Sequence, residues 1–214
     1  FRSITMKKFF ITLVLLTSFT SVFAVETKFD GLGLHFSIPM TFEYAENNGI
    51  KATSDMFAIG FGLDGLSLFS DKIGLFCSGD FFFPKKMNLR LSYAGSTYSA
   101  SVSSADFNSI YGMSTLIGPA IVITKTENML LFVSPGVHYM MLHTSTNSSS
   151  ESSYMFGVGA DIQDLIYFAK YGYFSFGLTA TLDFFGFTSS YGSSSSGKTI
   201  DFSLIPAIGI GMKF

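Results

Sequence analysis

The chain has 214 residues, of which 48% are hydrophobic and 13% are charged, and its formal net charge is −2. Soluble domains carry about 25% charged residues, so this composition argues against a soluble protein with a fully solvated surface. There is no basic patch, which argues against a nucleic-acid partner. A single cysteine, Cys77, excludes an internal disulfide.

Residues 1–24 predict a secretory signal peptide. Lys7 and Lys8 precede an apolar run that begins at Phe9, and the segment ends on Ala24 at a suitable cleavage point. A transmembrane helix would need about 20 apolar residues, and this run is shorter.

The mature domain is expected to cover residues 25–214. These residues carry 10 Lys and Arg against 15 Asp and Glu, a net charge of −5. The residues before Met6 are interpreted as an upstream extension of the reading frame. Since no long apolar run follows residue 24, helical membrane spans are excluded from this domain.

Period-two alternation of apolar with small or polar residues recurs along the mature domain and predicts β-strands. The expected strands cover 29–44, 55–69, 73–83, 107–123, 129–143, 154–162, 174–187 and 200–214. Pro84 is expected to end the third strand, because proline cannot donate to a ladder. A change of phase at Asp64 and Gly65 predicts a β-bulge there. Three prolines fall inside predicted strands: Pro119, Pro135 and Pro206.

The two sets of alternating positions along these strands, here called their two phases, differ in composition. One is mainly Phe, Leu, Ile and Met, whereas the other is mainly Gly, Ser, Thr and Asp. A soluble sandwich would place Lys, Glu and Arg on its water-facing phase. An apolar outer face and a small, polar inner face suit a barrel in lipid. The sequence therefore predicts an all-β fold, an eight-stranded antiparallel transmembrane β-barrel.

The connections alternate in length, as in outer-membrane barrels, where short turns are periplasmic and long loops face outward. The predicted outer loops are long and polar, and cover 45–54, 84–106, 144–153 and 188–199. The predicted turns are 70–72, 124–128 and a longer aromatic segment at 163–173. Both termini are then expected in the periplasm. Tyrosines and one phenylalanine are expected in the interfacial girdles: Tyr167, Phe168, Tyr171 and Tyr173 on the periplasmic side, and Tyr44, Tyr111, Tyr139 and Tyr154 on the outer side.

The final strand alternates around Phe202, Leu204, Ile208 and Ile210, with Ile205 and Pro206 as exceptions, and ends on Phe214. It resembles the closing strand of bacterial outer-membrane barrels, whose terminal aromatic residue belongs to the signal read by the barrel-assembly machinery. The resemblance implies a bacterial outer-membrane location, with lipid and this machinery as partners. Length and strand count are similar to those of the small OmpW/OmpX-type barrels.

The interior of an eight-stranded barrel is just wide enough to be filled by side chains, so a wide pore is not expected. Ser134 falls in the inward phase together with the other lumen candidates, which are His35, Asp80, Phe82, His138, Met140, Asp161, Asp183, Asp201, Ile205 and Lys213. The acids among them are interpreted as structural lumen groups, with an ion or ligand path as the alternative.

Catalytic, cofactor and metal sites are not expected. Ser134 and His138 share a strand face, but four residues of strand separate them by about 13 Å, beyond the reach of a nucleophile and its base. The three histidines do not have zinc-ligand spacing.

Three functions remain open. An OmpW-like barrel would pass small hydrophobic molecules through a narrow lumen with a lateral exit to the membrane, and the inward apolar residues Phe82, Met140 and Ile205 favour it. An OmpX-like barrel would bind host or surface ligands through its outer loops, and the best loop candidates are Lys85, Lys86, Arg90, Tyr93 and Tyr98. A lipid-modifying enzyme is the third choice.

Overall fold

The computed structural model describes residues 29–47, 50–190, 193–197 and 199–214. The predicted signal peptide, residues 1–24, lies outside the described residues. Within the described ranges, no helix is long and apolar enough to cross a membrane.

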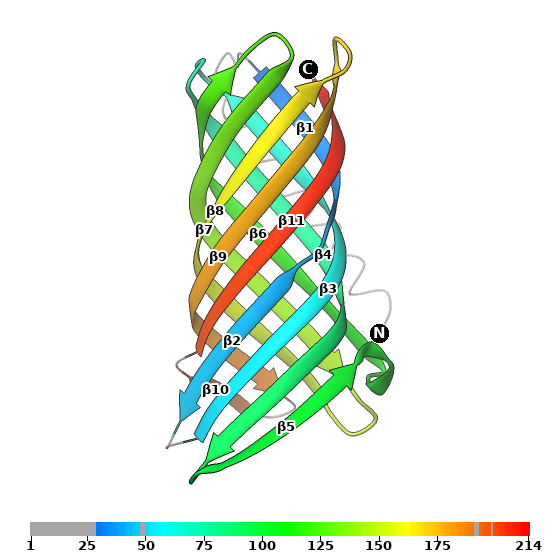
Figure 1. Cartoon of the computed structure of the whole chain (residues 1–214), viewed down its shortest axis with the longest axis vertical. Helices are drawn as coiled ribbons and strands as arrows, with labels where there is room; N and C mark the ends of the chain where they lie inside the picture. The colour runs from blue at the N-terminus through cyan, green and yellow to red at the C-terminus, as the bar shows by residue number, and fades with distance from the viewer. Residues whose placement is uncertain (1–28, 48–49, 191–192, 198) are drawn as a thin grey trace.

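The structure is a barrel of long, tilted antiparallel strands (Figure 1). The strands are β1 (Phe29–Ser37), β2 (Met40–Asn47), β3 (Ile50–Leu68), β4 (Ile73–Tyr93), β5 (Ser96–Ser103), β6 (Ser109–Lys125), β7 (Met129–Ser145), β8 (Ser150–Tyr167), β9 (Gly172–Ser190), β10 (Ser193–Gly197) and β11 (Thr199–Lys213). A short 3₁₀ turn, η1 (Ser104–Asp106), joins β5 to β6 and begins with a capping box from Ser103.

Eight wall positions close the ring, as predicted. The strands β1 and β2 share one position, because both pair with β3 on one side and with β11 on the other. The ring continues through β4, β6, β7, β8 and β9, and β11 pairs with β9 to complete it. The predicted fold class is therefore confirmed.

The outer surface is apolar and aromatic. On β11, Ile208 is 53% exposed and Phe202 is 41% exposed, whereas Ser203 between them in the opposite phase is 1% exposed. Aromatic rings on neighbouring strands contact one another along this surface, as in the Tyr154–Phe187 pair with ring centroids 4.8 Å apart. Such a surface suits hydrocarbon outside and a packed polar lumen inside.

The prediction that Pro84 ends the third strand was wrong. The strand β4 passes through Pro84 and continues to Tyr93. The register shifts here, because Phe57 pairs with Lys86 and Ala58 pairs with Pro84, so Lys85 is the extra residue of a β-bulge. A bulge accommodates a proline because it interrupts the ladder.

The bulge predicted at Asp64 and Gly65 is not present, since these residues pair in register with Ser78 and Cys77. Pro119, Pro135 and Pro206 lie inside strands, as predicted.

Residues 84–106 are not a loop, contrary to the prediction. They form the end of β4, the strand β5 and η1, and β4 and β5 make a hairpin that extends past the rest of the wall (Figure 1). A turn at Ala94 and Gly95 closes this hairpin, with positive φ at both residues. The hairpin carries all five predicted loop candidates, Lys85, Lys86, Arg90, Tyr93 and Tyr98.

The prediction of a longer connection at 163–173 is also wrong. The connection is shorter, because β8 reaches Tyr167 and β9 begins at Gly172. Tyr173 is 2% exposed and packs inside the barrel, so it does not belong to an interfacial girdle. Tyr167 is half-buried and packs against the same interior cluster. Phe168 and Tyr171 are exposed at the turn.

Candidate functional site in the barrel interior

The interior consists of layers along the barrel axis. Near the turns at 69–72, 126–128 and 168–171, an apolar cluster fills the lumen. Its buried members are Phe29, Leu66, Leu68, Phe76, Ala120, Leu130, Phe132, Leu165 and Tyr173. A polar layer follows, and then a second apolar cluster closer to the β4–β5 hairpin. The polar layer is thus enclosed by apolar side chains on both sides.

His35 organises one half of the polar layer. Its Nδ1 lies 2.9 Å from Oδ2 of Asp64, and its Nε2 lies 2.9 Å from Oδ1 of Asp80. Ser37 donates to the same Asp80 oxygen, and Gln163 donates to Asp64 from β8. Since β8 and β3 are not neighbours in the ring, the Gln163–Asp64 bond crosses the lumen.

His138 organises the other half. Its Nε2 lies 2.8 Å from Oγ of Ser114, and its Nδ1 lies 2.8 Å from Oδ1 and 2.9 Å from Oδ2 of Asp183. All three residues are buried. Sequence analysis placed Ser134 too far from His138 to bond to it, and the serine within reach is Ser114 on the neighbouring strand β6. No motif links these three positions, which are 24 and 45 residues apart. Only the register of β6, and the reach of His138 over Gly157 of β8 to Asp183 on β9, bring them together.

The hydrogen-bond chain Ser114–His138–Asp183 has the connectivity of a nucleophile, a base and an orienting acid. Its setting does not favour catalysis. The oxygen of Ser114 lies in a strand whose backbone groups pair with β4 and β7, so ladder bonds occupy the amides that could stabilise an oxyanion. The chain is better explained as a fully bonded polar core element.

Glycines make room for these side chains. A Cβ atom at Gly62 would overlap the ring of His35, and one at Gly157 would lie 2.5 Å from Oδ1 of Asp183. The small residues in the inward phase therefore determine where the large polar side chains can lie.

A row of carboxylates leads from His138 towards the hairpin end. Asp183 on β9 is paired with Asp201 on β11, and Asp201 is paired with Glu43 on β2. Directly opposed residues have Cβ atoms about 4.5–5.5 Å apart, so the three acids are neighbours. Asp183 and Asp201 are buried, and Glu43 accepts a bond of 3.2 Å from Ser54.

Several buried acceptors in this layer have no partner among the described residues. They are Oδ1 of Asp64, Oδ1 of Asp161 and the hydroxyls of Ser134 and Thr181. Ser134 and Asp161 are directly opposed on β7 and β8. Buried polar atoms are normally hydrogen-bonded, so these positions favour water or a donor group of a solute.

A plug of soft apolar side chains separates the polar layer from the hairpin end. Its buried members are Met56, Ala58, Phe82, Met140 and Met155, and Met87 and Leu142 pack against them. A Cβ atom at Gly112 would overlap the ring of Phe82, which is the large aromatic side chain of this plug. Methionine is unbranched and adaptable, so this plug can change shape with little strain.

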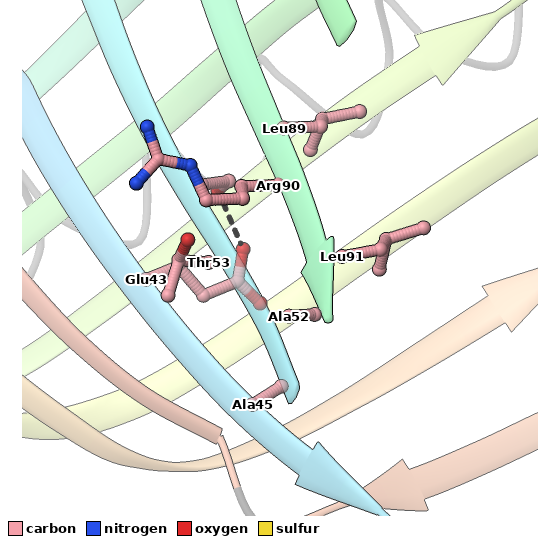
Figure 2. Close-up of a pocket in the computed structure, with 8 residues that line it drawn as sticks. Glu43, Ala45, Ala52, Thr53, Leu89, Arg90 and Leu91 are labelled. Carbon is pink, nitrogen blue, oxygen red and sulfur yellow. Dashed lines mark hydrogen bonds between the residues drawn. The ribbon is translucent and has the colours of Figure 1, made fainter. Parts of the chain in front are cut away.

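Two cavities open on the hairpin side of the plug. Figure 2 shows the first, of about 210 Å³, which is lined by Glu43, Ala45, Ala52, Thr53, Ser54, Leu89, Arg90 and Leu91. The second, of about 140 Å³, is lined by Glu43, Ser153, Tyr154, Met155, Gly186, Phe187, Thr188 and Thr199. Glu43 lines both cavities, and Met155 connects the second with the plug. We call this region the vestibule.

The structure places the lumen candidates as follows. His35, Asp80, His138, Asp161, Asp183 and Asp201 are buried in the polar layer, and Phe82 and Met140 are in the plug. Ile205 is buried on β11. Lys213 is not near the acids, because its Nζ lies over the rings of Phe29 and Tyr167 at the opposite end. Sequence reasoning did not identify Asp64, Ser114 and Gln163, although the alternation of their strands indicates an inward orientation.

The described part of the chain contains no group of three or more His, Cys, Asp or Glu side chains that could hold a metal ion.

No protein-family model and no curated protein matches the chain. Its fold is similar to that of the outer membrane protein OprG from Pseudomonas aeruginosa, at 16% identity over 87% of this chain and 95% of OprG, with a TM-score of 0.58. It is also similar to the outer membrane protein AlkL in lipid bilayers, at 14% identity over 87% of this chain and 90% of AlkL, with a TM-score of 0.56. The fold is therefore that of the small bacterial outer-membrane β-barrels, and the predicted resemblance is confirmed.

Proposed function

We propose that this outer-membrane barrel admits small hydrophobic molecules from the outer surface into its lumen. The observation that carries the proposal is a continuous apolar track along the inner face of the β4–β5 hairpin. Tyr93, Leu91, Leu89 and Met87 follow one another in the same phase of β4, and Tyr98 is paired with Leu91. Leu89 and Leu91 line the vestibule, and Met87 packs on the plug.

The track is exposed although it is apolar. Tyr98 is 70% exposed and Leu91 is 49% exposed on a hairpin that extends beyond the wall. Exposed apolar surface next to a cavity is typical of a binding surface for an apolar ligand. The adaptable methionines of the plug would let such a ligand displace them and reach the lumen.

A lateral exit would lie where few backbone amides form hydrogen bonds between neighbouring strands of the wall. Strand β1 ends at Ser37 and β2 begins at Met40, with the buried Pro39 between them. Beside this break, β11 contains Pro206, which also lacks an amide hydrogen. One bond, from Ile38 N to Pro206 O, remains at 3.0 Å. This seam is the position we propose for release into the membrane.

We further propose that the hairpin end faces outward and that both termini lie in the periplasm. Long strands and hairpins at one end and short turns at the other support this orientation. The same proposal includes cleavage of residues 1–24 on export, and the intact mass of membrane-extracted protein tests it. A mature chain that begins at Val25 is expected, and retention of residues 6–24 would contradict export.

The uptake proposal is tested with two substitutions on opposite faces of one strand. Cells that express the wild type should take up radiolabelled octane faster than cells without the protein. Leu91→Asp interrupts the apolar track and should reduce uptake to the level of cells without the protein. Ser92→Asp adds the same charge to the other face of β4 and should leave uptake unchanged. Equal uptake by the two variants would contradict the proposal.

Adhesion through the hairpin is the second candidate function. Lys85, Lys86 and Arg90 are exposed on it together with Tyr93 and Tyr98, which provides cationic and aromatic contacts for a host or surface ligand. Deletion of residues 94–95 and the paired ends of the hairpin would abolish surface binding in this case.

We do not propose an enzyme, because Ser114 lies beneath the plug and the strand that carries it pairs with β4 and β7. A fluorophosphonate probe should leave Ser114 unlabelled, and labelling that Ser114→Ala abolishes would reverse this conclusion.

A further inference from the structure

We infer that the interior selects solutes by charge, and accepts neutral or cationic apolar molecules while rejecting anionic ones. The inference rests on the proposed uptake of hydrophobic molecules and specifies their chemical class. It would exclude apolar carboxylates and sulfonates and admit apolar alcohols and amines.

The balance of charged groups carries the first part of the argument. The polar layer holds five inward aspartates, and Glu43 adds a carboxylate in the vestibule. The aspartates are Asp64, Asp80, Asp161, Asp183 and Asp201. Across the described residues, no lysine or arginine is buried among them. A low-dielectric lumen strengthens the preference for cations that these acids create.

The two histidines offer no free donor to an anion. His35 already contacts two carboxylates, and His138 contacts Asp183 and Ser114. Each imidazole nitrogen therefore has a partner, and an incoming anion finds no free cationic donor. Arg90, which also lines the vestibule, is exposed on the rim and lies outside the polar layer.

The unpartnered acceptors supply the second, independent observation. Asp64 and Asp161 are both more than nine-tenths buried. The Oδ1 atom of each accepts no hydrogen bond from another described residue. An ammonium or hydroxyl group can donate to them, whereas a carboxylate or sulfonate cannot.

The path to these acceptors is lined by acids from the start. Glu43, Asp201 and Asp183 are successive cross-strand neighbours that lead from the vestibule to His138. A solute in the vestibule would meet Glu43 and, at the rim, Arg90. Beyond the vestibule it would meet Asp201 and Asp183 of the same row, so the row would act as the selecting element.

The test compares two probes of the same chain length, hexylammonium, which carries N–H donors, and hexanesulfonate, which carries none. The purified mature protein is placed in zwitterionic lipid nanodiscs, and binding of each probe is measured by NMR titration. Since a cleft of one charge sign concentrates counter-ions roughly 10–1000-fold, the ammonium is expected to bind at least about tenfold more tightly. Equal binding, tighter sulfonate binding or no binding of either probe would overturn the inference.

Variants identify the selecting groups. The double variant Asp183→Asn with Asp201→Asn should lose most of the preference for the ammonium. If that variant does not fold, Glu43→Gln, which removes one vestibule carboxylate and no bond of either histidine, should reduce the preference instead. Asp55→Asn removes the same charge from the outer face of β3 and should have no effect. Loss of selectivity in Asp55→Asn would show that only net charge matters and would overturn the assignment.

Influx of the same probes into proteoliposomes separates the two proposals. Selective binding without influx would contradict the uptake function but leave the charge selection intact. Influx of hexanesulfonate as fast as that of hexylammonium would support uptake and overturn the selection.

Discussion

Nε2 of Gln163 lies 3.1 Å from Oδ2 of Asp64, on strands that face each other across the barrel. A direct bond between side chains of opposite walls leaves no space for an open channel at this level. The lumen is therefore a packed polar core with apolar layers on both sides, as expected for eight strands. Any solute must displace side chains in order to pass.

A charged residue on the outer face of β11 is expected to destabilise the folded barrel. Ile208→Arg places a cation on the surface assigned to lipid and should weaken folding into liposomes by roughly 2–4 kcal/mol near the midplane. Ala207→Ser, in the adjacent inward position, should be nearly neutral. Folded and unfolded fractions in urea, resolved by gel mobility, measure both effects. Similar behaviour of the two variants would show that alternation does not report lipid exposure.

His35 is expected to keep its position only because Gly62 has no Cβ atom. Gly62→Ala places a methyl group in steric overlap with the backbone oxygen of Gly79 and with Nε2 of His35. It should destabilise the barrel by roughly 1–3 kcal/mol, as overpacking does. Gly65→Ala, on the outward face of the same strand, has no neighbouring atom closer than 3.9 Å and should change stability little. Urea unfolding in liposomes gives both values, and equal destabilisation would show that the close contacts at Gly62 do not cause the effect.

Two buried serines should respond differently to removal of their hydroxyl groups. Ser114→Ala leaves Nε2 of His138 without its partner at 2.8 Å and should cost roughly 1–3 kcal/mol. Ser134→Ala removes a buried hydroxyl that has no partner, together with its desolvation penalty, and should be neutral or stabilising. The comparison uses the same unfolding assay, and a larger loss for Ser134→Ala would reveal a bond partner for it that the structure does not contain.

The plug is expected to control conductance. The wild type should give little or no current in planar bilayers. Phe82→Ala removes the large aromatic ring of the plug and should produce small channels, whereas Phe83→Ala, on the exposed outer face, should not. Channels of nanosiemens size in the wild type would contradict an eight-stranded ring.

The terminal aromatic residue is expected to promote assembly. If Phe214 and its strand are recognised by edge pairing with the assembly machinery, deletion of Phe214 should reduce outer-membrane insertion without changing synthesis. Cell fractionation followed by immunoblotting compares the two proteins. Unchanged insertion would remove Phe214 as an assembly signal.

Period-two alternation was sufficient to predict the eight wall positions and the two faces of the wall, because a strand presents successive side chains to opposite sides wherever it lies. It did not predict where the strands end, since β4 and β8 extend into segments expected as connections and β5 lies wholly within one. The inward orientation of His35, Asp80, His138 and Asp183 follows from that alternation alone. The alternation also made Phe202, Ile208 and Ile210 candidates for lipid contact, and these side chains are exposed in the structure.

The tertiary structure decided which inward residues meet. Register between strands and the reach of side chains across the lumen bring Ser114 to His138 and Gln163 to Asp64, and neither distance can be read from one strand. It also decided that β4 continues through Pro84, because a bulge at Lys85 absorbs the missing donor and carries the strand onward into the hairpin. Alternation is a local property of the backbone, whereas the partners of a buried side chain depend on how eight strands close into one ring.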